Sequence, residues 1–318
     1  MNATTPGIAN LDHPTVSIKS CVFYRNSATR VAAIRARSRA VLTAENNLFY
    51  ENRASLGGAI AANQYHTYIN RNTFYKNAAT SAGGAIWAER IPSVDTNILH
   101  ISIHSNIFDN NLQGSSTTVE GANMHLTGPT TDTWLRYIWF AANCVQNEDT
   151  HYSATDGSSS FGINFEADPK FVNPSAYDFR LKYHSSLIEL FGGNPGNAEK
   201  DLAGNPRFVG DADFGALEYI LIPNQDGVIH VRKGGSGNGT GSSWDNAVEE
   251  LAAVLEYKSS VDEGSDSGIE KIWISAGTYK PQFGLVAPHP QYPNDPNQNI
   301  PGYDPQHPYA TFELSKDM

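Results

Sequence analysis

The sequence predicts an all-β chain whose N-terminal part is a parallel β-helix, and three observations predict it. Two short motifs recur in fixed phase, β-branched runs precede them, and the segments between them are too short for helices. In a parallel β-helix each turn of the chain, called a coil below, stacks on the last at the strand spacing of roughly 4.8 Å. Equivalent residues of successive coils therefore form columns along the axis.

The first motif is a phenylalanine followed three residues later by an asparagine, and it recurs at a spacing of about 25 to 34 residues. It appears as "CVFYRN", "NLFYEN", "NTFYKN" and "NIFDNN". An Asn amide carries both donors and an acceptor, so it can bond the equivalent residue of the next coil. We therefore expect an aromatic stack inside the coils and an amide ladder at a bend: Phe23, Phe49, Phe74 and Phe108, and Asn26, Asn52, Asn77 and Asn111.

The second motif is "GGAI", which ends at Ile60 and again at Ile86 and has looser versions ending at Ile34 and Met124. Glycine tolerates a positive φ and a close approach of backbone, so the pair predicts a tight corner. The following Ala and Ile then resume an inward-facing strand.

The coil count also predicts the state of the two cysteines. Cys21 lies in the first coil and Cys144 in the fifth, so about four rungs, roughly 19 Å, separate them. A disulfide needs Cα atoms about 4.4–6.8 Å apart. Both thiols should be free, and we expect both to be largely buried.

The two co-phased motifs, over about residues 15 to 145, resemble the chlamydial polymorphic outer-membrane-protein repeat. They also resemble the right-handed parallel β-helices, pectate-lyase-like solenoids, of large bacterial surface proteins. The resemblance implies right-handed winding and a secreted or cell-surface, outer-membrane-associated segment that serves adhesion more often than catalysis. The fourth coil departs from the pattern with "GANM", and the fifth, "AANCVQNED", loses the phenylalanine.

The sequence pattern changes after the coils, and Glu166–Tyr219 resembles the choice-of-anchor Q module that closes bacterial β-helices. The matching residues are Asp168-Pro169, Phe171, Asp178, Arg180-Leu181, Ser185, Asp201-Leu202, Gly204 to Arg207 and Asp213 to Glu218. A cap is needed because an open strand edge pairs with other chains. Asp201, Asp213 and Glu218 could hold calcium; alternatively, Asp201 and Arg207 could brace the cap through a charge-assisted hydrogen bond. No other cofactor is expected.

The third segment resembles the opening of another β-helix, in which a helix plugs the first coil. A strand, "VIHV", precedes a glycine-rich turn and a helix near residues 245–257, with Ser243 or Asp245 as N-cap. The turn lacks the Gly-Lys-Ser/Thr ending of a phosphate-binding loop. A strand follows at Ile272–Ala276, then a proline-rich loop at Pro281–Pro308, and the resemblance implies an inward strand at Thr311–Leu314. So short a unit should not complete its own core, and its incomplete ends could self-associate.

The predicted domains are therefore coils over 1–150, a cap over 151–222 and the incomplete second β-helix over 223–318. A net charge of −11 argues against nucleic acid, whose phosphates need clustered cations. No apolar run is long enough to span a membrane. The start of the chain has no signal-peptide pattern, so we expect neither a signal nor an anchor in this segment.

Candidate binding residues come from two further columns next to the phenylalanines. Tyr24, Tyr50 and Tyr75 would stack on the outside, where they could hold a sugar ring or serve as a structural ladder. Glu51 lies beside them, between Arg25 and Lys76 in the column of alternating charge. No catalytic residue is predicted.

Two functions from different classes fit these columns. The leading one is a non-catalytic surface segment for adhesion, whose partner is a surface glycan or a protein of a host or neighbouring cell. The alternative is a carbohydrate-active enzyme, a polysaccharide lyase or glycoside hydrolase, with its groove along the coils.

Overall fold

The computed structural model describes residues 14–31, 33–36, 40–63, 66–89, 99–117, 121–127, 136–145, 152–154, 159–161, 163–183, 185–188, 200–207, 212–262 and 267–279. The chain divides into two compact units, Met1–Asn164 and Phe165–Met318, called unit 1 and unit 2. The three-part division at residues 150 and 222 stays a prediction. The proline-rich loop at Pro281–Pro308 and the strand at Thr311–Leu314 lie outside the described residues.

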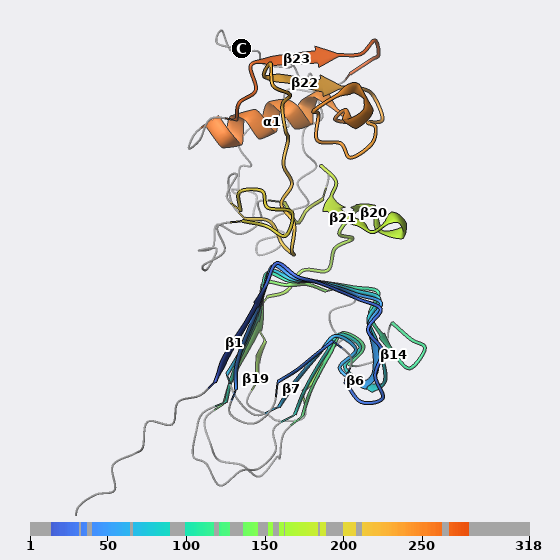
Figure 1. Cartoon of the computed structure of the whole chain (residues 1–318), viewed down its shortest axis with the longest axis vertical. Helices are drawn as coiled ribbons and strands as arrows, with labels where there is room; N and C mark the ends of the chain where they lie inside the picture. Colours follow the sequence, from blue (N-terminus) through green and yellow to red (C-terminus); the bar gives the residue numbers. More distant parts are fainter. Residues whose placement is uncertain are drawn as a thin grey trace, which may run out of the picture. The chain divides into compact units, whose positions relative to one another are not determined.

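Unit 1 consists of short strands gathered into four sheets, and Figure 1 looks along the stack, so that successive coils lie over one another. The first sheet contains β1 (Thr15–Lys19), β4 (Val41–Glu45), β8 (Thr67–Asn70), β12 (Leu99–His104), β16 (Arg136–Ala141) and β19 (Ser159–Phe161). The second contains β2 (Val22–Tyr24), β5 (Leu48–Tyr50), β9 (Thr73–Tyr75), β13 (Ile107–Asp109) and β17 (Cys144–Val145). The third contains β6 (Arg53–Leu56), β10 (Ala78–Ala82) and β14 (Leu112–Gln113). The fourth contains β3 (Ile34–Ala36), β7 (Ile60–Asn63), β11 (Ile86–Glu89), β15 (Met124–Thr127) and β18 (Tyr152–Ala154).

All named strand pairs of unit 1 are parallel, and each coil pairs with the next in the register that the motifs predict. Phe49 pairs with Phe23 on one side and with Phe74 on the other, and Phe74 pairs with Phe108. Ile60 and Ile86 pair in the same way at the end of the second motif. The predicted all-β parallel solenoid is confirmed at this level.

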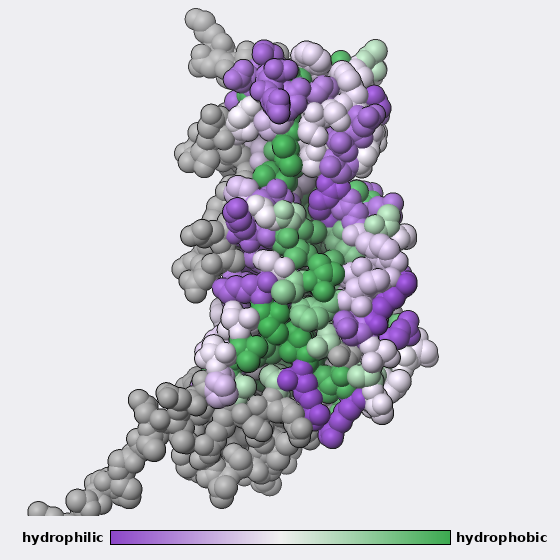
Figure 2. Space-filling view, in the orientation of Figure 1, coloured by the Kyte–Doolittle hydropathy of each residue, from purple (hydrophilic) through white to green (hydrophobic). Residues whose placement is uncertain are grey.

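The core of unit 1 is a set of apolar columns between the sheets. Phe23, Phe49, Phe74 and Phe108 form one stack, with ring centroids 4.8, 4.9 and 4.8 Å apart and nearly parallel planes. Phe49, Phe74 and Phe108 are fully buried, whereas Phe23 in the first coil is only partly buried. Figure 2 shows apolar residues over the part of unit 1 that the strands enclose, with hydrophilic residues on the flanks.

The paired glycines of "GGAI" meet two different requirements. Gly57 adopts φ +59°, a conformation that favours glycine. Gly58 lies so close to the next coil that a Cβ would be 2.1 Å from the carbonyl oxygen of Gly84. Gly83 (φ +68°) and Gly84, whose Cβ would be 2.1 Å from the Ala122 oxygen, repeat both features. Both expected roles of the glycines are therefore confirmed: the first glycine of the pair has the positive φ, and the second allows the close approach of backbone.

Two asparagine ladders run along unit 1, and only the ladder that contains Asn26 and Asn52 was predicted. In the predicted column each amide donates to the next side-chain oxygen, Asn26 to Asn52 at 2.8 Å, Asn52 to Asn77 at 2.8 Å and Asn77 to Asn111 at 3.0 Å. The second column repeats the same bonds at 2.9–3.0 Å, and in the coils that carry the phenylalanine motif its asparagines stand two residues before Phe49, Phe74 and Phe108. Its members are Asn47, Asn72, Asn106, Asn143 and Asn164.

Both cysteines are free, as predicted, but only one is buried. Cys144 is fully buried in β17. Cys21 is exposed and takes the position of the second asparagine ladder in the first coil, where its backbone N–H donates to Asn47 Oδ1 at 3.0 Å. The expectation of a buried Cys21 was wrong, because another described coil covers only one side of the first coil.

Unit 2 begins with the antiparallel pair β20 (Phe171–Asn173) and β21 (Asp178–Leu181), joined by the 3-10 turn η2 (Pro174–Ala176). Further on, β22 (Val228–Val231) pairs in parallel with β23 (Lys271–Ile274). Between them lie the 3-10 turn η3 (Trp244–Asn246) and helix α1 (Leu251–Asp262). The helix starts later than predicted because the chain extends at Ala247, and Val248 bridges to Val231 before α1 begins.

The core of unit 2 lies between the strands and α1. It contains Leu221, Ile229, Val231, Val248, Leu251, Ala253, Val254, Tyr257 and Ile269. Leu221 belongs to this core and Tyr183 and Tyr219 pack against it, so residues of the predicted cap contribute to it. The expectation that the segment from residue 223 onward cannot complete a core of its own therefore stays a prediction. Trp273 and Ile274 of β23 remain 52% and 44% exposed.

Candidate functional site

The predicted tyrosine column exists but is largely closed. Tyr24 and Tyr50 stack with ring centroids 4.2 Å apart. Tyr50 and Tyr75 are only 7% and 6% exposed, whereas Tyr24 is partly exposed. The guanidinium of Arg25 lies 4.6 Å from the ring centroid of Tyr24, and the ammonium of Lys76 lies 5.0 Å from that of Tyr75. In this column Tyr24 is the ring that a sugar could reach in this conformation.

Glu51 belongs to a column of corner residues that all adopt a left-handed backbone. Arg25, Glu51, Lys76 and Asn110 have φ between 51° and 55°, a conformation in which residues other than glycine are uncommon. Glu51 Oε2 accepts from Arg25 Nε at 2.6 Å. Because the pair is partly exposed, its contribution to stability is small.

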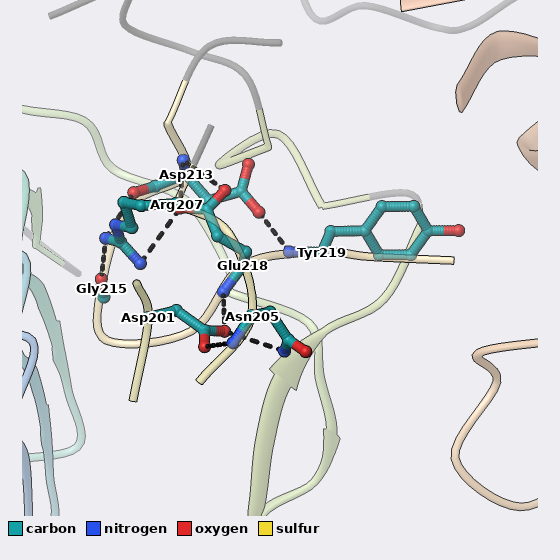
Figure 3. A network of polar contacts seen from close by, with 7 residues as sticks. All are labelled: Asp201, Asn205, Arg207, Asp213, Gly215, Glu218 and Tyr219. Carbon is teal, nitrogen blue, oxygen red and sulfur yellow. Dashed lines mark hydrogen bonds and ion pairs between the residues drawn. The ribbon is translucent and has the colours of Figure 1, made fainter. Parts of the chain in front are cut away.

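The second predicted group, Asp201, Asp213 and Glu218, lies in one buried polar network with Arg207 (Figure 3). Arg207 is fully buried, and its Nη1 lies 3.0 Å from Glu218 Oε1. Its Nη2 donates to the carbonyl oxygens of Asp213 and Gly215. The expected brace between Asp201 and Arg207 was wrong, because Arg207 pairs with Glu218.

The carboxylates of this network accept backbone N–H groups. Asp201 accepts from the backbone N–H groups of Asn205 at 2.8 Å and Glu218 at 3.0 Å. Asp213 accepts from the N–H of Tyr219, and Glu218 accepts from the N–H of Asp213. These bonds join two stretches of chain, 201–207 and 213–219, that contain neither helix nor strand, so the polar network holds these loops in place where secondary structure does not.

The network carries more negative than positive groups, and this imbalance affects Glu218. Burial raises the pKa of Glu218 well above its ordinary value of 4.5, and the nearby charges of Asp213 and Asp201 act in the same direction. Arg207 and the N–H of Asp213 oppose the shift. Glu218 therefore retains its proton to a higher pH than an exposed glutamate would.

Calcium at Asp201, Asp213 and Glu218 stays a prediction. Over the described parts of the chain, no three or more His, Cys, Asp and Glu side chains are grouped as a metal ion would require. All three carboxylates are 2% exposed and already accept N–H donors, so the arrangement favours internal bracing over contact with a soluble substrate.

Comparison with known proteins gives one match. The family model of the Chlamydia polymorphic membrane protein repeat matches residues 73–89. This stretch runs from the start of β9 to the end of β11 and contains one phenylalanine motif and one "GGAI". Searches of curated proteins and of solved structures returned no match. Where the chain is described, no helix is long and apolar enough to cross a membrane.

Proposed function

We propose that the chain is a surface-displayed, non-catalytic part of a right-handed parallel β-helix protein that contacts glycans or proteins of neighbouring cells. The observation that carries the proposal is the family match at residues 73–89, because those residues contain β9, β10 and β11, three of the strands of one coil. The matched family is a membrane-protein repeat by its name, which favours display outside the cell.

The ladders support a display role in physical terms. The coils of unit 1 are joined through backbone hydrogen bonds and an asparagine column, and up to Asn111 also through a second asparagine column and the phenylalanine stack. Such a stack extends in one direction by adding coils that contact only their neighbours, which suits a rigid spacer. Adhesion needs a spacer of this kind, which holds binding groups away from the cell.

The cap is part of the same proposal. We infer that Glu166–Tyr219 closes the solenoid as a choice-of-anchor Q type module, with the Arg207 network holding its loops. The motif residues Asp201, Arg207, Asp213 and Glu218 are all buried, which suits residues retained for structure.

Surface display is tested by labelling intact and permeabilised cells of the source with an antibody against the chain. Signal on intact cells supports the proposal, whereas signal only after permeabilisation contradicts it. Adhesion is tested by incubating the purified chain with arrays of glycans and with neighbouring cells.

The enzyme alternative is tested by turnover assays on uronic-acid and neutral polysaccharides. Activity that disappears in Glu51→Gln would replace the proposal with a carbohydrate-active enzyme. The matched control is Glu45→Gln, a change of the same chemistry in the same coil.

A further inference from the structure

Unit 2 presents a row of aromatic side chains that none of the predicted sites includes. His230 of β22 pairs in register with Trp273 of β23. The His230 ring centroid lies 4.9 Å from that of Trp244 and 5.5 Å from that of Trp273, and both contacts are edge-to-face. We call Trp244, His230 and Trp273 the aromatic row. The guanidinium of Arg232 lies 5.7 Å from the ring centroid of Trp244.

The row lies on the face of the sheet opposite the core. Ile229 and Val231 of β22 belong to the core of unit 2, and successive side chains of a strand point to opposite faces. His230, and with it Trp273, therefore points away from α1. Trp273 is 52% exposed and Trp244 is half-buried, whereas His230, which contacts both rings, is buried. Large apolar side chains gathered on a surface mark sites of interaction more often than isolated ones do.

The chain around the row is built to hold it in place. Ser236 Oγ donates to the carbonyl oxygen of Trp244 at 2.6 Å and accepts from the N–H of Ala247 at 3.0 Å. A Cβ on Gly237 would be 2.0 Å from the Asp245 oxygen, so glycine is required for this close approach. His230 Nδ1 lies 3.0 Å from the carbonyl oxygen of Gly241, and because a carbonyl oxygen only accepts, Nδ1 is the donor in this bond. The row is thus pre-organised, which lowers the entropic cost of binding.

The glycine-rich turn itself does not present a phosphate site. Its N–H groups donate within the chain: Gly235 to Arg232, Ser236 to Ala247, Gly239 to Ser236 and Gly241 to Asn246. Asn238 and Thr240 donate to side-chain oxygens of Asn246 and Asn238. The glycines therefore shape the loop that positions Trp244, and the ligand surface is the aromatic row.

We propose that the aromatic row and Arg232 bind a pyranose ring of a glycan; this inference deepens the proposed adhesive function and rests on it. The apolar C–H face of the sugar lies on the indole of Trp273, because a flat, rigid aromatic ring offers large contact area at low conformational cost. Arg232 supplies N–H donors to hydroxyl or carboxylate oxygens of the sugar. Its guanidinium has no acidic partner in the part of the chain that the structure describes.

Two other occupants fit the surface less well. Nucleic acid would also stack on tryptophan, but a net charge of −11 repels its phosphates. A strand from a second copy could pair with β23, an edge strand of the described two-stranded sheet. It would bond the backbone at the edge and leave the outward face of Trp273 open, so it does not explain the row.

The experiment measures binding of cellohexaose and of hexagalacturonate to the full chain by isothermal titration calorimetry. Wild-type protein is expected to bind at least one of the two. Trp273→Ala should weaken binding about tenfold or more, a loss of about 1.4 kcal/mol. Ile222→Ala, at an apolar residue of unit 2 that is 41% exposed, should bind like wild type. Because Trp273 is exposed, unchanged urea midpoints will show that both variants fold.

The two glycans separate the roles of Arg232. If Arg232 binds a carboxylate, Arg232→Met weakens the binding of hexagalacturonate far more than that of cellohexaose. If it binds hydroxyls, the binding of both glycans weakens equally, and either result supports the site.

Equal binding by Trp273→Ala and wild type overturns this inference. If Tyr24→Ala then abolishes that binding, the adhesive function stands and its site lies on the coils. Binding of neither glycan overturns the inference as well, and concentration-dependent self-association lost in Trp273→Ala would assign the row to a second copy.

Discussion

Replacing Asn77 with alanine tests whether the amide ladders hold the coils together. Asn77 is fully buried, and its Nδ2 donates to the carbonyl oxygen of Phe49 at 2.9 Å and to Asn111 Oδ1 at 3.0 Å. Its Oδ1 accepts from the backbone N–H of Asn52 at 3.2 Å and from Asn52 Nδ2 at 2.8 Å. The side chain therefore bonds the coil before it and the coil after it.

The loss expected for Asn77→Ala follows from the groups left behind. The N–H of Asn52 and the carbonyl oxygen of Phe49 lose the bonds that they make to the side chain, and water does not reach them. An unsatisfied buried polar group costs about 1–3 kcal/mol, so two such groups with a small cavity cost about 3–5 kcal/mol. Asn26 belongs to the same column but is exposed, so Asn26→Ala should cost only about 0.5–1.5 kcal/mol.

The free energy of unfolding is measured by urea titration of the full chain, followed by circular dichroism in the strand region and by tryptophan fluorescence. The transition of unit 1 is the one that should shift. If Asn77→Ala costs no more than Asn26→Ala, the ladder contributes nothing specific and the argument fails.

A second substitution, Asn77→Asp, separates the donors from the shape of the side chain. Aspartate keeps the size and the acceptors but places a carboxylate beside the oxygens of Phe49 and Asn111. Burial raises its pKa above the unfolded value of about 3.9. The deficit of the variant relative to wild type should therefore shrink as the pH falls through the folded pKa, because the protonated acid regains a donor. A deficit independent of pH would show that the donors do not matter.

Four further predictions follow from the same contacts. Phe49→Ala should destabilise unit 1 by about 3–5 kcal/mol in urea titration, and Phe23→Ala by clearly less, because Phe23 is only partly buried; equal costs would contradict the stack. The native state keeps a proton on Glu218 above pH 4.5, so the melting temperature of unit 2 should fall as the pH rises from that value through the folded pKa, and Glu218→Gln should abolish this slope. Calcium and EDTA should leave the melting temperature of unit 2 unchanged, because N–H groups and Arg207 occupy the carboxylates; a rise that grows with calcium concentration would establish a metal ion instead. Iodoacetamide should label Cys21 in the native protein and Cys144 only after unfolding, and rapid native labelling of both thiols, read by intact mass, would contradict the burial of Cys144.

The coils could be predicted because their motif recurs. A single "FYKN" does not identify a fold, but its recurrence in the same phase identifies both the inward-facing phenylalanine and the asparagine at the corner. The second asparagine ladder was missed although its signal is in the sequence. Asn47, Asn72 and Asn106 each stand two residues before a motif phenylalanine, and Cys21 in the first coil hides the pattern.

The rest could not be predicted because it depends on contacts between segments without a repeat. Seven acidic residues lie within twenty positions of Arg207, and nothing in the sequence indicates that Glu218 is its partner. The left-handed corners at Arg25, Glu51 and Lys76 were also hidden, because residue types that rarely adopt positive φ occupy them. The aromatic row needs the pairing of His230 with Trp273, which are far apart in the chain.

Columns also suggest where function lies in a protein of this kind. A residue type that repeats in every coil does the same structural work in each, so a side chain that departs from its column is the better functional candidate. On the outer face of the first sheet, Thr43, Tyr68, Ser102 and Trp139 are paired in successive coils. No residue type repeats in this column, and Trp139 is the exposed member of the four, 49% exposed, with its ring centroid 5.6 Å from that of His104. By the same argument the Phe and Asn columns are structural, and we propose that the exposed tryptophans, Trp139 on the coils and Trp273 in unit 2, contact the partners of the protein.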